Sequence, residues 1–295
     1  MRRLAKPLLV LLLIPITLGA WGEKGHLMIN RMAIDTAAAK LPEFMGAGRN
    51  QLIYDAYEPD RWREETGSPL AVFQAADHFI DSEYIGSITA ITQTDRFAFQ
   101  EMLAEKKIGL VKVGYLPYAI MENYGRLRNA FRMWRNAKTP EDREAARVNA
   151  LVYAGTMGHY VGDGSNPMHL TWHYNGWDKT QPNPKGYTTT AGIHNRFEGN
   201  YVNAAIDIAN ARRTVQPPQR LANVFGDVKS YLEQSFKDLE PLYQMEKDGE
   251  FNPAKPSAKS TEFIERHLAR AATMLSNLWY TAWMESAEPA VAAKP

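Results

Sequence analysis

A histidine and a carboxylate stand four residues apart at His159 and Asp163, and a second histidine follows at His169 beyond a Gly/Ser/Asn/Pro break. Residues four apart lie on one face of an α-helix, so the first two side chains can bind the same ion. The break lets the third approach from another direction. Imidazole nitrogen and carboxylate oxygen are ligands that zinc favours. The triplet therefore indicates a metal site, although a buried His–Asp hydrogen bond would give the same pattern.

A second pair with the same spacing lies downstream, at His194 and Glu198. The chain has seven histidines and no cysteine, so any metal site must be built from His, Asp and Glu. Two histidines are weaker candidates: His267 is interpreted as a structural residue of the last predicted helix, and His173 as a pocket residue close to His169. The five that stand beside glycine, a carboxylate or a helix break are His26, His78, His159, His169 and His194.

Acidic candidates upstream of these pairs are ambiguous. Asp60 follows Pro59, and Pro-Asp is common in turns and surface ion pairs. Asp55 competes with Asp60 for the role of an acidic ligand. The residues alone leave this choice open.

The elements that must position these side chains are predicted to be helices. Thr139 and Pro140 form a strong helix start, and the helix that they open runs into His159 and Asp163. Strand signals are sparse, the best being Tyr187–Thr190 within an irregular segment over 164–192. The sequence therefore predicts an all-α, single-domain multi-helix bundle. Besides the helix from 140, we expect helices over 27–40, 92–107, 118–138, 193–211, 219–246 and 260–287.

The two ends of the chain differ from the domain between them. Residues 1–20 combine early basic residues with an apolar run and end on Gly19-Ala20, which is typical of a cleaved secretory signal peptide. We therefore expect an exported protein, periplasmic or secreted, with its domain over 21–287 and a disordered tail over 288–295. Without the early basic residues the chain has 31 bases and 33 acids, which excludes a nucleic-acid-coating surface.

The motifs around these candidates resemble those of the bacterial zinc-dependent phospholipase C family and of its relatives, the single-strand-specific zinc nucleases that also act as 3′-nucleotidases. The resemblance spans residues 21 to 198. The residues that carry it are Trp21, His26, Pro59-Asp60, Asp77-His78-Phe79, His159-Tyr-Val-Gly-Asp163, Pro167-Met-His169 and Gly192-Ile-His194-Asn-Arg-Phe-Glu198.

The resemblance implies a cleft with three clustered Zn²⁺ ions. One ion takes Asp60, His78, His159 and Asp163, and a second takes His169, His194 and Glu198. The third takes His26, Asp163 as a bridge, and the free amino group and carbonyl of Trp21, which cleavage after Ala20 would expose. Such ions lower the pKa of water and bind phosphate oxygens, and Asp60 could also orient the attacking water or accept its proton.

The sequence favours the phospholipase branch of this superfamily. Glu198 within His-Asn-Arg-Phe-Glu is similar to the phospholipase motif, whereas the 24 residues between His169 and His194 are nearer the nuclease interval. The expected substrate is therefore a phospholipid, with at most peripheral membrane contact and no stable protein partner. Single-stranded nucleic acid is the alternative substrate, and an inactive periplasmic zinc-binding protein is a further alternative.

Four residues are candidates for contact with the substrate. Trp172 and Trp177 could stack on a base, cage a cationic head group or enter a lipid interface, or could merely pin a long loop to the domain. Glu23 could pair with a cationic head group, and His173 could line the pocket.

Overall fold

Helices form the framework of the computed structural model, which describes residues 21–64 and 67–288. Within those ranges there is no β-strand, only an isolated bridge between Tyr174 and Gly176. The predicted all-α fold class is therefore confirmed. The predicted signal peptide lies outside the described residues, and so does the predicted disordered tail apart from Glu288. None of the described helices is long and apolar enough to cross a membrane.

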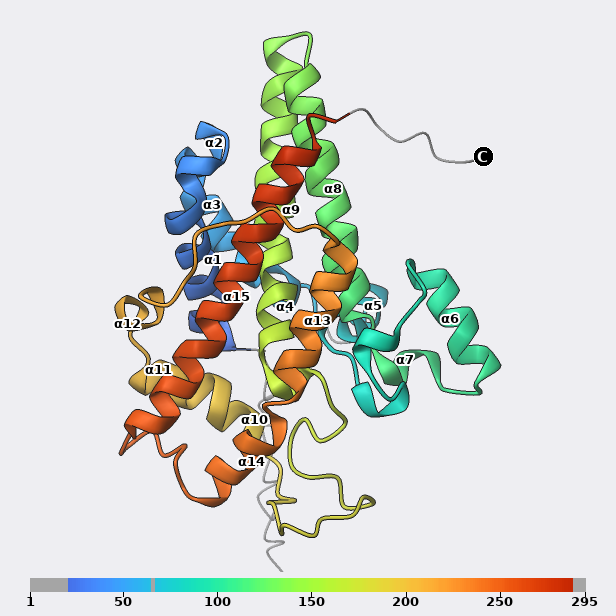
Figure 1. Ribbon diagram of the computed structural model, residues 1–295, viewed down its shortest axis with the longest axis vertical. Coiled ribbons are helices and arrows are strands. Elements are labelled where there is room, and N and C mark those ends of the chain that lie inside the picture. Colours follow the sequence, from blue (N-terminus) through green and yellow to red (C-terminus); the bar gives the residue numbers. More distant parts are fainter. Residues whose placement is uncertain (1–20, 65–66, 289–295) are drawn as a thin grey trace, which may run out of the picture.

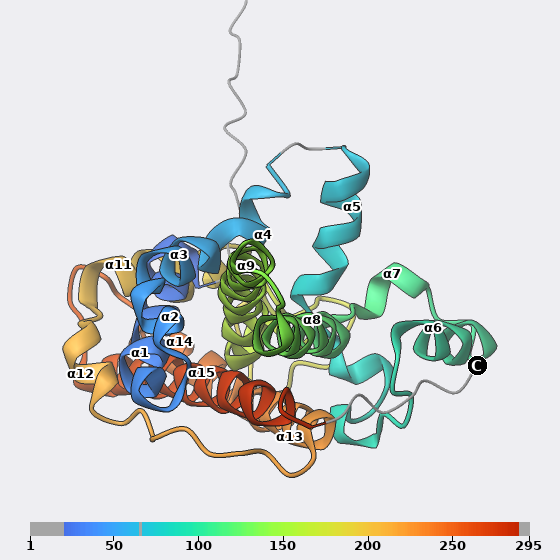
Figure 2. The same cartoon turned by 90° about the horizontal axis from the view of Figure 1, so that it is seen from above.

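Four long helices form the centre of the molecule: α1 (Gly22–Ala37), α8 (Leu116–Asn136), α9 (Pro140–Ser165) and α15 (Ala258–Glu285). Helices α8 and α9 form an antiparallel hairpin, and α15 packs against α1, α8 and α9 (Figure 1). Most of the shorter elements surround the lower half of this group, whereas α2 and α3 lie beside α1, at the upper left in Figure 1. Helices α5, α6 and α7 lie on the α8 side (Figures 1 and 2).

The shorter α-helices are α2 (Glu43–Ala47), α3 (Arg49–Tyr54), α4 (Glu58–Arg61), α5 (Pro69–Ala75), α6 (Arg96–Glu105), α7 (Leu110–Val113), α10 (Ile193–Asn195), α11 (Val202–Ala205), α12 (Ile208–Arg212), α13 (Val224–Phe236) and α14 (Leu239–Lys247). Between them lie 3-10 turns at η1 (Ala38–Lys40), η2 (Asp55–Tyr57), η3 (Ala76–His78), η4 (Ser82–Tyr84), η5 (Ile88–Ala90) and η6 (Pro167–His169), and a π-helical segment at η7 (Arg196–Tyr201).

The predicted start of the central helix is confirmed. The Thr139 hydroxyl accepts a hydrogen bond from the Asp142 amide at 3.0 Å, and Pro140 occupies the first turn. Two longer predictions were wrong in their continuity. The helix expected over 193–211 is interrupted by the π-helical η7 and by an extended residue at Ile206, and the one over 219–246 is two helices, α13 and α14.

Glycines on α9 allow its neighbours to approach closely. A Cβ added at Gly158 would lie 1.8 Å from Oδ1 of Asn30, and one at Gly162 would lie 2.8 Å from Nδ1 of His26. The Asn30 amide is buried and donates to the carbonyl oxygens of Leu52 and Gly155. Small residues on α9 therefore let α1 bring His26 up to the helix that carries His159 and Asp163.

We predict that Gly158→Ala destabilises the protein by about 2–4 kcal/mol, because the added methyl group overlaps a buried, hydrogen-bonded side chain. Gly125→Ala on α8 is the matched control. Nothing lies within 4 Å of the Cβ at that position, so this change should stabilise the helix by about 0.5–1 kcal/mol. Urea unfolding of the two variants measures the difference, and equal effects would contradict the packing described.

Candidate metal centre

The structure brings eight of the predicted ligand residues together in the interior. Their donor atoms form three groups, in each of which the atoms lie within 4.8 Å of one another. All eight side chains are buried. The groups are His26, Asp60 and His159; His78, His159 and Asp163; and His169, His194 and Glu198. Buried histidine and carboxylate groups at these distances could hold metal ions.

Asp163 occupies the central position. Its Oδ1 lies 3.5 Å from Nε2 of His26, and its Oδ2 lies 3.3 Å from Nδ1 of His78 and 3.5 Å from Nε2 of His159. The residue is close to the C-terminal end of α9, where the helix dipole favours cations. This carboxylate is therefore placed to serve more than one ion.

Three of the histidines are oriented by backbone carbonyl groups. Nδ1 of His159 donates to the Ala56 oxygen at 2.8 Å, Nδ1 of His169 to the His78 oxygen at 2.7 Å, and Nδ1 of His194 to the Tyr174 oxygen at 2.9 Å. Each bond fixes the ring and leaves Nε2 as the lone-pair donor, an arrangement found at protein metal sites.

Burial shifts the pKa values of most of the donor residues. It lowers the pKa of His26, His78 and His159 well below the ordinary value, so these rings are neutral, which is the form that binds metal. It raises the pKa of Asp163 well above its usual range, and that of Asp60 is raised as well. Around Asp163 and Asp60 the metal-free interior therefore disfavours the carboxylate charge that a cation would compensate, whereas the burial of Glu198 is outweighed by nearby His194, which lowers its pKa.

Several buried polar atoms in this region have no hydrogen-bond partner among the described residues. They are both ring nitrogens of His26, Nε2 of His78, Oδ2 of Asp60, Oδ1 of Asp163 and Oε1 of Glu198. Buried polar atoms are nearly always paired, and each exception needs an explanation. Because the atoms converge and have the chemistry of zinc ligands, bound metal ions fit this donor set.

Trp21 lies at the same centre. Its backbone nitrogen donates to Oε2 of Glu198 at 3.0 Å, and its buried indole donates to the Gly162 oxygen at 2.8 Å and to Oγ of Ser165 at 2.9 Å. Two residues lie with partners other than those that the family resemblance implies. The Trp21 nitrogen, expected with His26 and Asp163, lies at Glu198. Asp60, expected with His78, His159 and Asp163, lies with His26 and His159.

A cavity of about 510 Å³ opens beside the donor groups. Three of the histidines, His78, His169 and His194, lie in its wall, and Trp172 is the one predicted substrate contact among its lining residues. Of the other polar and aromatic residues of the wall, Phe79 stands in the Asp77-His78-Phe79 motif and Tyr174 in the aromatic-rich segment over 164–192. Sequence reasoning missed the rest, since none belongs to a recognisable motif. They are Arg63, Asp81, Tyr84, Lys112 and Asp178.

The other three predicted substrate contacts lie elsewhere. His173 and Trp177 stack face to face at 3.9 Å, and Trp177 also packs on Tyr187 and Tyr243, so these rings hold the 170–192 segment together. The Glu23 carboxylate is exposed and lies 3.5 Å from Arg61. None of the three is among the residues that line the cavity.

The electrostatics of the cavity wall are mixed. Asp81 is mostly buried, and burial, assisted by nearby Glu83, raises the pKa of its carboxyl to about 8. Arg63 in the same wall is ion-paired with Asp60.

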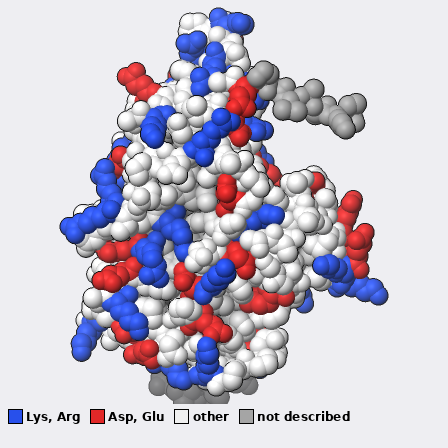
Figure 3. Space-filling view, in the orientation of Figure 1, with Lys and Arg blue, Asp and Glu red and all other residues white. Residues whose placement is uncertain are grey.

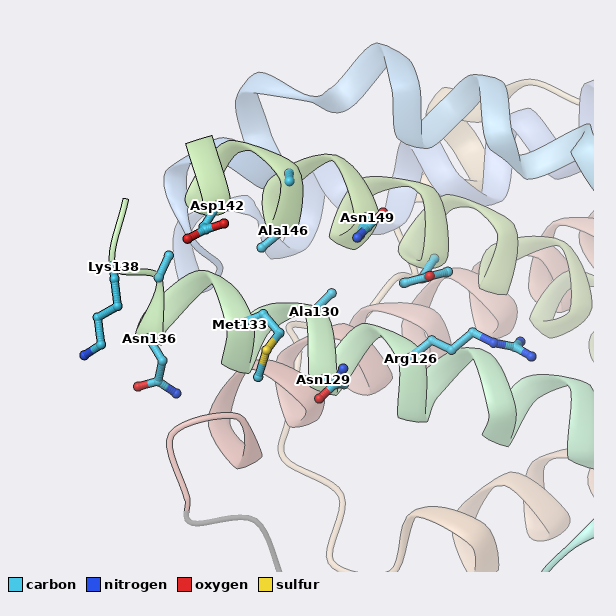
Figure 4. A pocket seen from close by; sticks show the side chains of 12 residues that line it. Arg126, Asn129, Ala130, Met133, Asn136, Lys138, Asp142, Ala146 and Asn149 are labelled. Carbon is cyan, nitrogen blue, oxygen red and sulfur yellow. The ribbon is translucent and has the colours of Figure 1, made fainter. Parts of the chain in front are cut away.

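A second hollow, of about 470 Å³, lies between α8 and α9 at the far end of the hairpin (Figure 4). Its lining includes Arg126, Asn129 and Asn149 but none of the three donor groups.

His267 is buried behind Trp21, with Nδ1 2.6 Å from the Ser165 oxygen and Nε2 3.3 Å from Asp238. Burial lowers its pKa to about 4. Above about pH 6.5, the ordinary pKa of the ring in the unfolded chain, the ring is neutral in both states and the fold keeps its full stability. As pH falls from there to about 4, the unfolded chain binds a proton that the folded chain does not, and stability is lost.

We predict that His267 accounts for roughly 3 kcal/mol of lost stability over that window, in addition to the loss that His26, His78 and His159 cause in metal-free protein. In urea unfolding of chelator-treated protein, His267→Asn should lose that much less stability over the window than the unmodified chain. An equal loss in both would contradict this interpretation.

No protein-family model matches the chain, and no curated protein sequence matches it either. Among solved structures, the chain is similar to an alpha toxin from Clostridium absonum, with 14% sequence identity and a TM-score of 0.48. The match covers 91% of this chain and 67% of the toxin chain. A likeness of this size assigns no activity, so a function must be argued from the side chains themselves.

Proposed function

We propose that the protein is a zinc-dependent phosphodiester hydrolase, and specifically a phospholipase C that releases the phosphorylated head group of glycerophospholipids. One observation carries the proposal: Asp163 lies among buried donor groups whose histidines open onto a cavity. A site that needed only structural stability would have no reason to bring together so many buried polar atoms without hydrogen-bond partners among the described residues.

The residues that would hold zinc are the three donor groups and the Trp21 nitrogen. Zinc at such a site binds phosphate oxygens and lowers the pKa of water. The carbonyl groups of Ala56, His78 and Tyr174 keep three imidazoles in the orientation for ligation. Asp60 has one oxygen on Arg63 and one without a hydrogen-bond partner among the described residues, so it can orient a water molecule or accept its proton. No nucleophilic side chain is needed.

The cavity wall favours a lipid over a nucleic acid. It carries Lys112, Asp178 and Arg63, the last ion-paired with Asp60, so it has no marked basic excess for a polyanionic strand. The aromatic rings of Tyr84 and Trp172 in the same wall suit a head group. Basic and acidic side chains are also interspersed over most of the face drawn in Figure 3. The same aromatic rings could stack on a base, so nuclease activity is an explicit outcome of the experiment.

The test compares phosphatidylcholine with single-stranded DNA as substrates for zinc-loaded protein that begins at Trp21. Release of phosphocholine supports the proposal, and release of 5′-nucleotides without phosphocholine supports the nuclease instead. Hydrolysis of neither would identify an inactive zinc-binding protein. Asp60→Asn should abolish turnover, whereas Asp55→Asn, at a nearby buried carboxyl outside the donor groups, should retain it.

A further inference from the structure

Exposed apolar side chains gather on the two short helices beside the cavity, α5 and α7. Val72 of α5 is 61% exposed and Val111 of α7 is 60% exposed. Leu70, Phe73 and Leu110 on the same helices are exposed as well. Single exposed apolar residues are normal on a protein surface, but several beside a binding cavity mark an interaction surface.

Both helices reach the wall of the cavity that the donor groups share. Ala75 at the end of α5 and Lys112 in α7 are among its lining residues. In Figures 1 and 2, α5 and α7 project from the same side of the α8–α9 pair. Leu70, Val72, Leu110 and Val111 therefore lie on helices that border the cavity, whereas Phe73 lines a separate hollow with Gln74 and Asp77.

The α7 part of this rim is held in place by the backbone. The Tyr115 amide donates to the Ala76 oxygen at 2.7 Å, the Asp81 amide to the Val113 oxygen at 2.7 Å, and the Tyr115 hydroxyl to the Leu110 oxygen at 2.7 Å. Val113 is fully buried, so α7 has one side in the core and keeps Leu110 and Val111 outward. Ala76 begins the turn η3, which ends at the donor residue His78. The backbone segment that follows α7 is therefore hydrogen-bonded to the same turn that positions His78.

Basic residues surround the apolar part of α7. The run from 106 to 113 contains Lys106, Lys107 and Lys112, all exposed, and no acidic residue, although Glu101 and Glu105 precede it on α6. Lysines that flank exposed Leu and Val can pair with phosphate groups while the apolar side chains enter the layer beneath them. This charge pattern is complementary to a phospholipid surface.

We propose that the cavity rim, defined as Leu70, Val72, Leu110 and Val111 with Lys106, Lys107 and Lys112, seats the protein on a phospholipid surface. Seating brings head groups to the cavity mouth, next to the donor groups. The inference rests on the proposed function, because a lipid substrate gives the rim its occupant. A second copy of this chain is the competing occupant, and the experiment separates the two.

The test measures sedimentation of zinc-loaded protein with vesicles of phosphatidylcholine alone and of phosphatidylcholine with phosphatidylglycerol. We expect the double variant Leu110→Glu, Val111→Glu to bind both vesicles at least about tenfold more weakly than the unmodified chain. Lys106→Gln with Lys107→Gln should weaken binding chiefly to the anionic vesicles. Val148→Glu is the matched control, since Val148 is exposed on α9 about 22 Å along the helix from Asp163 and should bind as the unmodified chain does.

A soluble substrate distinguishes failure of the rim from failure of the proposed function. The double variant should hydrolyse a short-chain phosphatidylcholine below its micelle concentration at the unmodified rate, because neither residue lines the cavity. If the unmodified protein hydrolyses this substrate but sediments with neither vesicle, the proposed role of the rim is wrong and the proposed phospholipase activity still holds. Equal vesicle binding by the double variant would also overturn the role of the rim. Sedimentation velocity without vesicles tests the competing occupant. If the unmodified chain is a dimer and the double variant is a monomer, the rim belongs to a second copy instead.

Discussion

Asp163→Asn is expected to lower the zinc content of the protein by more than one equivalent per chain and hydrolysis by roughly 100-fold or more. The reason is geometric, because the carboxylate lies within 3.5 Å of ring nitrogens on His26, His78 and His159. An amide has the same shape but cannot supply the negative charge or two equivalent donor oxygens. Metal analysis after gel filtration, with hydrolysis measured on the same samples, provides the readout.

In metal-free protein, the same substitution should increase the stability of the fold at neutral pH. Burial raises the pKa of Asp163 well above its usual range, so at neutral pH ionisation of this carboxyl is unfavourable in the folded chain. A group with a raised folded pKa loses stabilisation as pH rises above its unfolded value, near 4. Chelator-treated Asp163→Asn should therefore be more stable than chelator-treated unmodified protein at pH 7, and the difference should vanish toward pH 4.

Asp55→Asn provides the matched control for the loss of zinc and of activity. Asp55 is also a buried carboxyl packed against α9, but it accepts a hydrogen bond from Gln51 and belongs to none of the donor groups. Its zinc content and activity should match those of the unmodified chain. Loss of a single equivalent in Asp163→Asn would contradict the bridging role, and an equal loss in Asp55→Asn would attribute the effect to general damage.

The long helices and the donor residues were accessible from the sequence because both leave local signals. Thr139-Pro140 marks a helix start by capping chemistry, and the four-residue spacings of His159 with Asp163 and of His194 with Glu198 follow helical periodicity. Even so, Glu198 lies in the π-helical η7, where one wider turn replaces the regular spacing that the pattern implied.

Residues outside such patterns could not be found in this way. The short elements from α2 to α5 carry Asp60 and lead into His78, yet none is long enough to show a period. Asp81, Tyr84 and Lys112 reach one cavity wall from segments whose meeting depends on tertiary packing. The residues by themselves left the choice between Asp55 and Asp60 open, and the family resemblance implied Asp60. In the structure only Asp60 lies with His26 and His159.

A single additional residue before Trp21 is expected to remove about one equivalent of zinc and to lower hydrolysis by roughly tenfold or more, with little effect on the fold. The backbone nitrogen of Trp21 lies 3.0 Å from Oε2 of Glu198 in a buried position. As a peptide nitrogen it can donate a hydrogen bond but cannot ligate a metal, whereas a free amine in the same place can do so. Protein that begins at Trp21 should therefore bind more zinc than protein that begins one alanine earlier, with circular dichroism as the check on folding.

Trp21→Phe separates the amine from the ring. It keeps the free terminus but removes the indole hydrogen bonds to the Gly162 oxygen and to Oγ of Ser165, so we expect unchanged zinc stoichiometry with about 1–3 kcal/mol less stability. The extension and the substitution thus predict opposite patterns, metal loss without unfolding and destabilisation without metal loss. An extended chain with its full zinc content and activity would show that the amine has no part in the centre. Trp21 would then act through its buried ring alone.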